Sequence, residues 1–117
     1  MTTHDWIMLG RRAVACEGFR WIPGMLDTTG QRLTEEWVWS CGSGHIPDLR
    51  DLETKGCLLR LVREALGDPL LYVEPEEDED DGSTWYVWTT GEVTRYRLGS
   101  HRTEAAALVT ALEAAND

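Results

Sequence analysis

The sequence predicts an α+β fold in which a small, mostly antiparallel sheet is sandwiched by about three helices. Three segments carry apolar residues at the three- and four-residue spacing of amphipathic helices. Other segments alternate apolar with polar residues, or are rich in aromatic and β-branched residues, as strands are. The expected order of elements is α-β-β-α-β-β-β-α. Because 117 residues suffice for one core and leave little room for a second, we expect a single domain over residues 1–117.

The first helix is expected from about Asp5 to Glu17. Thr3 or Asp5 can cap it, because either side chain accepts hydrogen bonds from the free N–H groups of a first turn. Gly18 suits the left-handed residue that ends a helix. The apolar stripe that predicts this helix consists of Trp6, Leu9, Ala13 and Cys16.

Two further helices are expected from their caps. One begins after Asp51 and closes at Gly67. Gly56 lies inside it at a cost of roughly 1 kcal/mol relative to alanine, which close packing against a neighbouring strand would explain. The last helix follows the cap residue Thr103 and covers about Glu104 to Ala115. Its apolar stripe consists of Leu108, Val109 and Leu112.

Five strands are expected. A hairpin joins Met25 and Leu26 to a returning strand over Leu33–Trp39, in which Trp37 and Trp39 share one face. The other three strands are expected over Leu70–Glu74, Thr84–Thr90 and Val93–Leu98.

The formal net charge of −10 is concentrated in one run. Seven of the 21 acidic residues fall in this run, and the other 14 face 11 basic residues, so the rest of the chain carries only about −3. We expect the run to form a solvated acidic loop at about residues 74–83. The overall charge disfavours direct binding to nucleic acid or to an anionic membrane, yet it leaves room for a local basic pocket that holds a small anion. The seven acids are Glu74, Glu76, Glu77, Asp78, Glu79, Asp80 and Asp81.

The cysteines and the chain start indicate a cytoplasmic protein. Cys16, Cys41 and Cys57 are too widely spaced for a zinc ribbon or a CxxC redox site, and a reducing cytosol is the simplest compartment. The first residues lack the basic start and apolar run of a signal peptide. No stretch approaches the roughly 20 apolar residues of a membrane-spanning helix.

No catalytic or metal-ligating pattern stands out, so we expect a non-enzymatic protein without a metal or cofactor. The segment Cys41–His45 places a thiol, a hydroxyl and an imidazole in one loop, but no acid is specified to orient the imidazole. A solvated loop is the favoured interpretation. His4, His45 and His101 lie far apart and form no HExxH pair.

The aromatic content is the unusual feature. Several of the six tryptophans lie near arginines, and an arginine fork with an aromatic plate suits the phosphate and base of a nucleotide. Tryptophans of a small sheet are more often core or interface residues. The residues expected to bind such a ligand are Arg20, Trp21, Trp39, His45, Arg97 and Thr103, the last through the N-terminus of the final helix.

Seven segments carry a family resemblance: residues 11–15, 21–25, 47–49, 56–59, 62–69, 103–109 and 111–115. They resemble small phage accessory proteins of the phage ABA-sandwich type. The resemblance covers most of the chain outside residues 74–100. It implies a helix-sheet-helix sandwich encoded by a phage or prophage, acting in the cytoplasm of an infected bacterium, with no catalytic residues to carry over.

Three functions remain open. The first is a counter-defence protein that sequesters a nucleotide-derived immune signal without cleaving it, as a homo-oligomer with a pocket at a symmetric interface. The second is an acidic inhibitor of a host defence nuclease or CRISPR complex, which acts as a DNA mimic or steric blocker. Against it, a DNA mimic spreads its acids over a surface. The third, a hydrolase that uses Cys41 or His45, has the least support.

Overall fold

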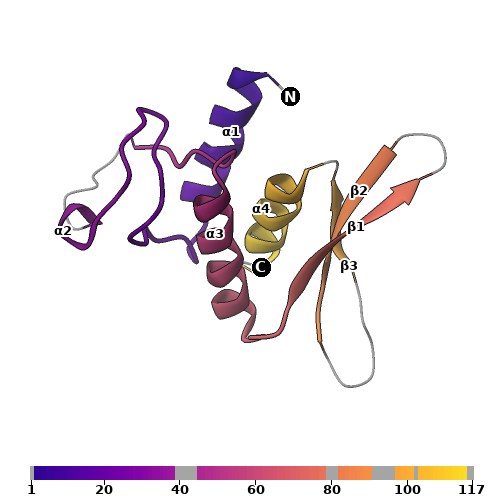
Figure 1. Ribbon diagram of the computed structural model, residues 1–117. Helices are drawn as coiled ribbons and strands as arrows, with labels where there is room; N and C mark the ends of the chain where they lie inside the picture. Colours follow the sequence, from indigo (N-terminus) through magenta and orange to yellow (C-terminus); the bar gives the residue numbers. More distant parts are fainter. Residues whose placement is uncertain (1, 39–44, 79–81, 91–96, 102, 116–117) are drawn as a thin grey trace.

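The α+β class predicted from the sequence is confirmed. The computed structural model describes residues 2–38, 45–78, 82–90, 97–101 and 103–115. In chain order, the elements are α1 (Thr3–Val14), α2 (Glu35–Val38), α3 (Leu52–Leu66), β1 (Tyr72–Asp78), β2 (Gly82–Trp88), β3 (Arg97–His101) and α4 (Glu104–Ala114) (Figure 1).

The sheet is antiparallel, with the strand order β1-β2-β3. Val73 pairs with Val87, and one face of the β1–β2 hairpin directs Val73, Trp85 and Val87 to the main core. Five strands are expected, whereas the described residues form three. The predicted strand over Thr84–Thr90 is confirmed as β2, two residues earlier than expected.

The layers are ordered differently from the predicted sandwich. Helix α4 lies between the sheet on one side and α1 and α3 on the other, and it contacts all three strands and both helices (Figure 1). The reason is the composition of α4, which is apolar on every face rather than along one stripe; such a helix belongs inside a core. Six of its residues are buried: Ala105, Ala107, Leu108, Val109, Ala111 and Leu112.

The helix caps follow the sequence in α3 and α4 and differ in α1. Asp51 caps α3, Gly67 ends it with a left-handed φ of 65°, and Thr103 caps α4. Helix α1 is capped by Thr2 rather than Thr3 or Asp5, because Thr2 and Asp5 form a reciprocal capping box. The helix also ends at Val14, three residues before its predicted end.

The structure tests the expected packing of Cys16 and of Gly56. Cys16 is buried as expected and lies in the main core. The packing explanation for Gly56 is wrong, because nothing lies within 4 Å of the position a Cβ would take there. Cys57 is half-buried and free.

The hairpin predicted over residues 25–39 is present only at its turn. Leu26 and Arg32 form an isolated antiparallel bridge, and the Leu33 amide donates to the Met25 carbonyl at 2.8 Å. The predicted returning strand is wrong, because residues 35–38 form the short helix α2. Two acids in the first turn of α2 favour a helix there. Trp37 therefore lies in a helix, and Trp39 lies outside the described residues.

The prediction that the whole acidic run forms a loop is also wrong. Strand β1 extends to Asp78, so five of the residues assigned to the loop pair with β2. The pairing of Pro75 with Trp85 and of Glu76 with Thr84 shows that the strand continues through the acids. Residues 79–81 lie outside the described residues.

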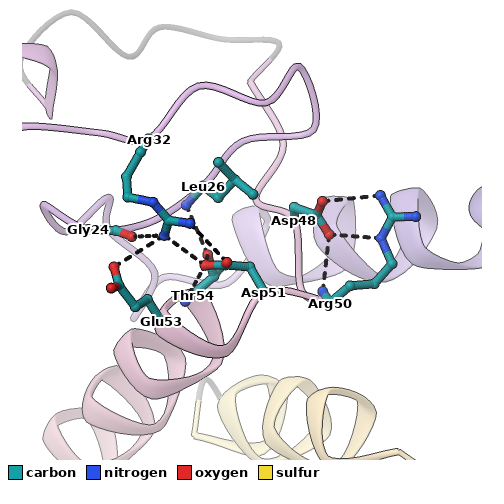
Figure 2. Close-up of polar contacts among 8 residues, drawn as sticks. All are labelled: Gly24, Leu26, Arg32, Asp48, Arg50, Asp51, Glu53 and Thr54. Carbon is teal, nitrogen blue, oxygen red and sulfur yellow. Dashed lines mark hydrogen bonds and ion pairs between the residues drawn. The ribbon is translucent and has the colours of Figure 1, made fainter.

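Residues 22–33 are tied to the start of α3 by one polar network (Figure 2). The Arg32 guanidinium donates to Asp51 at 2.9 and 3.0 Å, to the Gly24 carbonyl at 2.8 Å and to Glu53 at 3.2 Å. Hydrogen bonds from Arg32 hold the pKa of the Asp51 carboxyl well below its usual range. Asp51 therefore caps a helix and anchors a loop with one carboxylate.

A buried threonine completes the network. The hydroxyl of Thr54 donates to Asp51 at 2.9 Å and accepts from the Leu26 amide at 2.9 Å (Figure 2). Thr54 is fully buried, so both bonds form away from water. In the same view Arg50 pairs with Asp48 at 3.0 Å, at the surface.

Candidate functional site

The exposed side of the last two turns of α3 carries Arg60, Arg63 and Glu64. Arg60 donates through Nε to Glu64 at 3.3 Å, the helical spacing at which opposite charges meet. Arg63 turns toward the following chain and donates through Nε to the Leu71 carbonyl at 2.6 Å. The sequence predicts only that these side chains face solvent.

Arg20 reaches the same carboxylate from the segment after α1. Its two terminal nitrogens donate to the two oxygens of Glu64 at 2.5 and 3.0 Å, a two-pronged pair. Close packing at Gly18 brings this segment to α3, because a Cβ there would lie 3.0 Å from Leu112 and 3.2 Å from Ala65. We call Arg20, Arg60 and Arg63, with Glu64, the arginine cluster.

The arginine cluster borders a pocket at the end of α3. The pocket has a volume of about 390 Å³ and is lined by Arg60, Arg63, Glu64, Gly67 and Pro69. Gly67 ends the helix in a left-handed conformation, so the chain leaves the helix axis here. We call this hollow the α3 pocket.

The arginine cluster is locally basic in an acidic protein. The cluster holds three guanidinium groups and one carboxylate. Arg20 and Arg60 pair with Glu64, and within the described residues Arg63 makes no ion pair. Hydrogen bonds from Arg20 and Arg60 lower the pKa of Glu64, so the carboxylate stays ionised as their counter-ion. The negative end of the α3 dipole favours arginines at this place and weakens their field toward an outside anion.

Trp21 lies beside the cluster but is engaged in packing. Its ring meets Phe19 edge-on, with centroids 5.5 Å apart and planes at 83°. It also packs with Phe19 and Cys57 against a small core of Ile22, Met25 and Leu61. This half-buried ring is therefore chiefly a core residue, in line with the usual role of a tryptophan in a small domain.

The other candidate residues have separate surroundings. The Nδ1 atom of His45 lies 3.2 Å from the buried carboxylate of Asp27. Thr103 accepts from the Ala106 amide at 3.2 Å and so caps α4, which occupies its side chain. Arg97 begins β3, opposite Trp88. Trp39 lies outside the described residues. Among the candidate residues that the structure describes, none lines the α3 pocket, and only Arg20 reaches it, through the ion pair with Glu64.

Two features of the site were not found from the sequence. Arg60 and Arg63 form a cluster only together with Arg20, which lies 40 and 43 positions before them. No spacing rule connects residues so far apart. Asp27 supplies the orienting acid that the Cys41–His45 segment lacked, although the sequence offered a signal: an aspartate two residues before a threonine is typical of an Asx turn.

The described residues contain no metal-binding constellation. They include no group of three His, Cys, Asp or Glu side chains placed to hold a metal ion. Within the same part of the chain, no helix is long and apolar enough to cross a membrane. In comparisons with known proteins, no protein family, no curated protein and no solved structure matches this chain.

Proposed function

We propose that the protein binds a small nucleotide-like anion in the α3 pocket and sequesters it without cleaving it. The observation that carries the proposal is the arginine cluster, in which Arg20 and Arg60 share the Glu64 carboxylate and Arg63 lines the same 390 Å³ hollow. That volume lies within the range of about 300–1,000 Å³ usual for small-ligand sites.

Glu64 acts as a built-in counter-ion in this proposal. A phosphate group offers more acceptor oxygens than a carboxylate, and guanidinium forks match its geometry. The incoming phosphate takes over the donors of Arg20 and Arg60 and finds Arg63 with no acidic partner to displace. The mainly apolar wall contributed by Pro69 and the arginine stems suits the rest of the ligand.

The biological role follows from the phage resemblance. A phage protein that sequesters a nucleotide signal lowers its free concentration in the bacterial cytoplasm, which requires affinity and no chemistry. A homo-oligomer adds a second wall to the open α3 pocket. Light scattering with and without ligand tests the oligomeric state.

The decisive experiment uses a panel of cyclic oligonucleotides and ADP-ribose derivatives. Each is mixed with the protein, the free ligand is measured, and the protein is then denatured by heat. Release of intact ligand supports sequestration. Release of an altered ligand contradicts sequestration, and so does a panel in which the protein depletes no ligand.

Three variants assign the site. Arg63→Ala should weaken binding by about tenfold, because a hydrogen bond to a charged group contributes roughly 1.5–3 kcal/mol. Glu64→Gln should tighten binding, since it releases Arg20 and Arg60. Arg50→Ala is the matched control, because it removes an equal charge from an exposed ion pair elsewhere. Equal loss in Arg50→Ala and Arg63→Ala would exclude the α3 pocket.

One observation favours the second function, an acidic inhibitor. Glu74 and Glu76 lie two residues apart in a strand at the edge of the sheet, so they belong to the same face. Glu74 is exposed. Carboxylates held in a strand suit the basic nucleic-acid groove of a nuclease better than those of a loop. Two results together would select this function. The parent protein inhibits a target nuclease without depleting any nucleotide, and the double variant Glu74→Gln with Glu76→Gln abolishes the inhibition.

A further inference from the structure

His45 is held in one orientation by a buried carboxylate. Asp27 is only 2% exposed. Its Oδ1 accepts from the Thr29 amide at 2.9 Å, the Thr29 hydroxyl at 2.6 Å and the Gln31 amide at 3.0 Å, so the carboxylate cannot rotate freely. Its Oδ2 is left for His45 Nδ1 at 3.2 Å.

The bond to Asp27 fixes which nitrogen of His45 carries the proton. Burial by itself raises the pKa of Asp27, but the hydrogen bonds from Thr29, Gln31 and His45 outweigh it and hold the pKa below its ordinary value. An ionised carboxylate only accepts, so Nδ1 of His45 is the donor. The opposite edge of the ring, with Nε2, is therefore left for another partner.

A second hollow adjoins this ring. It has a volume of about 280 Å³ and is lined by Arg11, Val14, His45 and Ile46; we call it the α1 pocket. Arg11 is exposed and makes no ion pair within the described part of the chain. Its neighbour Arg12 is different, because it pairs with Glu113 at 2.5 Å.

Tight packing fixes the two sides of the α1 pocket against each other. At Gly10 a Cβ would lie 2.5 Å from Ile46 Cγ2 and 2.8 Å from the Pro47 carbonyl oxygen. The chain at residues 46–47 therefore lies directly on α1, and this contact places Arg11 and His45 on the same pocket.

We propose that the α1 pocket binds the phosphate group of a small phosphate monoester, with Arg11 and His45 Nε2 as its two polar contacts. Arg11 supplies an uncompensated charge and a planar fork. His45 Nε2 accepts a hydrogen bond from the hydroxyl of a singly protonated phosphate group. Val14 and Ile46 supply the apolar wall for the carbon-bearing part of the ester. This site is independent of the proposed α3 pocket.

The test titrates the whole protein, labelled with ¹⁵N, with phenyl phosphate and with inorganic phosphate at constant ionic strength. Saturable shifts of the His45 ring nitrogens are expected with both probes, at lower concentration with phenyl phosphate. Absence of saturable shifts overturns the site. Equal affinity for the two probes overturns the assignment of an ester.

Matched variants separate binding from folding. Arg11→Ala should weaken binding about tenfold, whereas Arg12→Ala, which removes the same charge one residue away, should leave it within about twofold. His45→Asn keeps an N–H near the position of Nδ1 for Asp27 and removes Nε2, so it should fold normally and lose binding. An Arg12→Ala loss equal to that of Arg11→Ala, or full binding by His45→Asn, contradicts the proposal.

The proposals for the two sites can be tested independently of each other. Arg63→Ala should leave phenyl phosphate binding at His45 unchanged, and Arg11→Ala should leave nucleotide depletion unchanged. Loss of both activities in either variant would mean that the α1 and α3 pockets are not distinct sites.

Discussion

Gly10 of α1 lies against Ile46 so closely that no side chain larger than hydrogen fits between them. A Cβ at Gly10 would come within 2.5 Å of a methyl carbon and within 2.8 Å of the Pro47 backbone oxygen. Glycine is a poor helix former, so its presence in the middle of α1 is explained by this contact.

Gly10→Ala should therefore destabilise the protein by roughly 1–3 kcal/mol, the cost of overpacking a close contact. Gly56→Ala is the control. It lies inside α3 with no atom within 4 Å of the added Cβ, and alanine should stabilise the helix by up to about 1 kcal/mol. Urea denaturation measures both, and a stabilising Gly10→Ala would show that the contact can relax.

Thr54→Val should cost about 1–3 kcal/mol, although valine has the same shape. The change leaves the Leu26 amide without its acceptor and Asp51 without one donor, in a fully buried place. Thr34 is exposed, and Thr34→Val should change the free energy of unfolding by less than about 0.5 kcal/mol. Similar values for the two variants in denaturant titrations would mean that the network contributes little.

Stability should fall as the pH drops from about 5 to 3. Asp27, Asp48 and Asp51 all have pKa values below the ordinary value. At Asp27 burial raises the pKa, but hydrogen bonds to the carboxylate outweigh it. At Asp48 and Asp51 the hydrogen bonds from Arg50 and Arg32 lower the pKa. A lowered pKa in the folded state gives stability that is present above the unfolded pKa, about 3.9, and lost as the pH falls toward the folded one.

Urea midpoints at pH 7, 5 and 3 measure this loss. Asp51→Asn should be less stable than the parent at pH 7, because it weakens the pair with Arg32, and should lose less on acidification. If Asp51→Asn loses as much stability between pH 5 and 3 as the parent does, other carboxylates cause the acid sensitivity.

Leu112→Ala should cost roughly 2–5 kcal/mol, because Leu112 is fully buried in α4 and truncation leaves a cavity in the main core. Leu70 is 71% exposed and serves as control, with an expected change below about 0.5 kcal/mol. If both variants unfold at the same denaturant concentration, α4 is not the centre of the core.

Local signals in the sequence were sufficient for α3, α4 and β2. Asp51, Gly67 and Thr103 act within one helical turn, so their roles can be read from neighbours alone. Trp37 shows the limit, because its alternation with Trp39 predicted a strand where two preceding acids start a helix. The acids after Glu74 predicted a loop by composition, yet pairing with β2 keeps them in a strand.

The candidate sites were predictable only in part. The neighbouring tryptophan predicts a ligand role for Arg20, whereas its partner in the structure is Glu64, 44 residues away. A glycine-rich segment predicts such a role for His45, whose partner Asp27 lies 18 residues earlier. Charge pairs of this kind depend on which segments pack together, and periodicity contains no information about that.

The central position of α4 has a kinetic consequence. The apolar faces of α1 and α3 meet α4 in the finished core, yet α4 follows both in the chain; Arg12 and its partner Glu113 are separated by 101 positions. During synthesis these faces have no native cover until the ribosome has released α4. Because contacts between segments far apart in the chain slow folding, we expect the apolar faces of α1 and α3 to be the surfaces most exposed to aggregation until α4 packs against them.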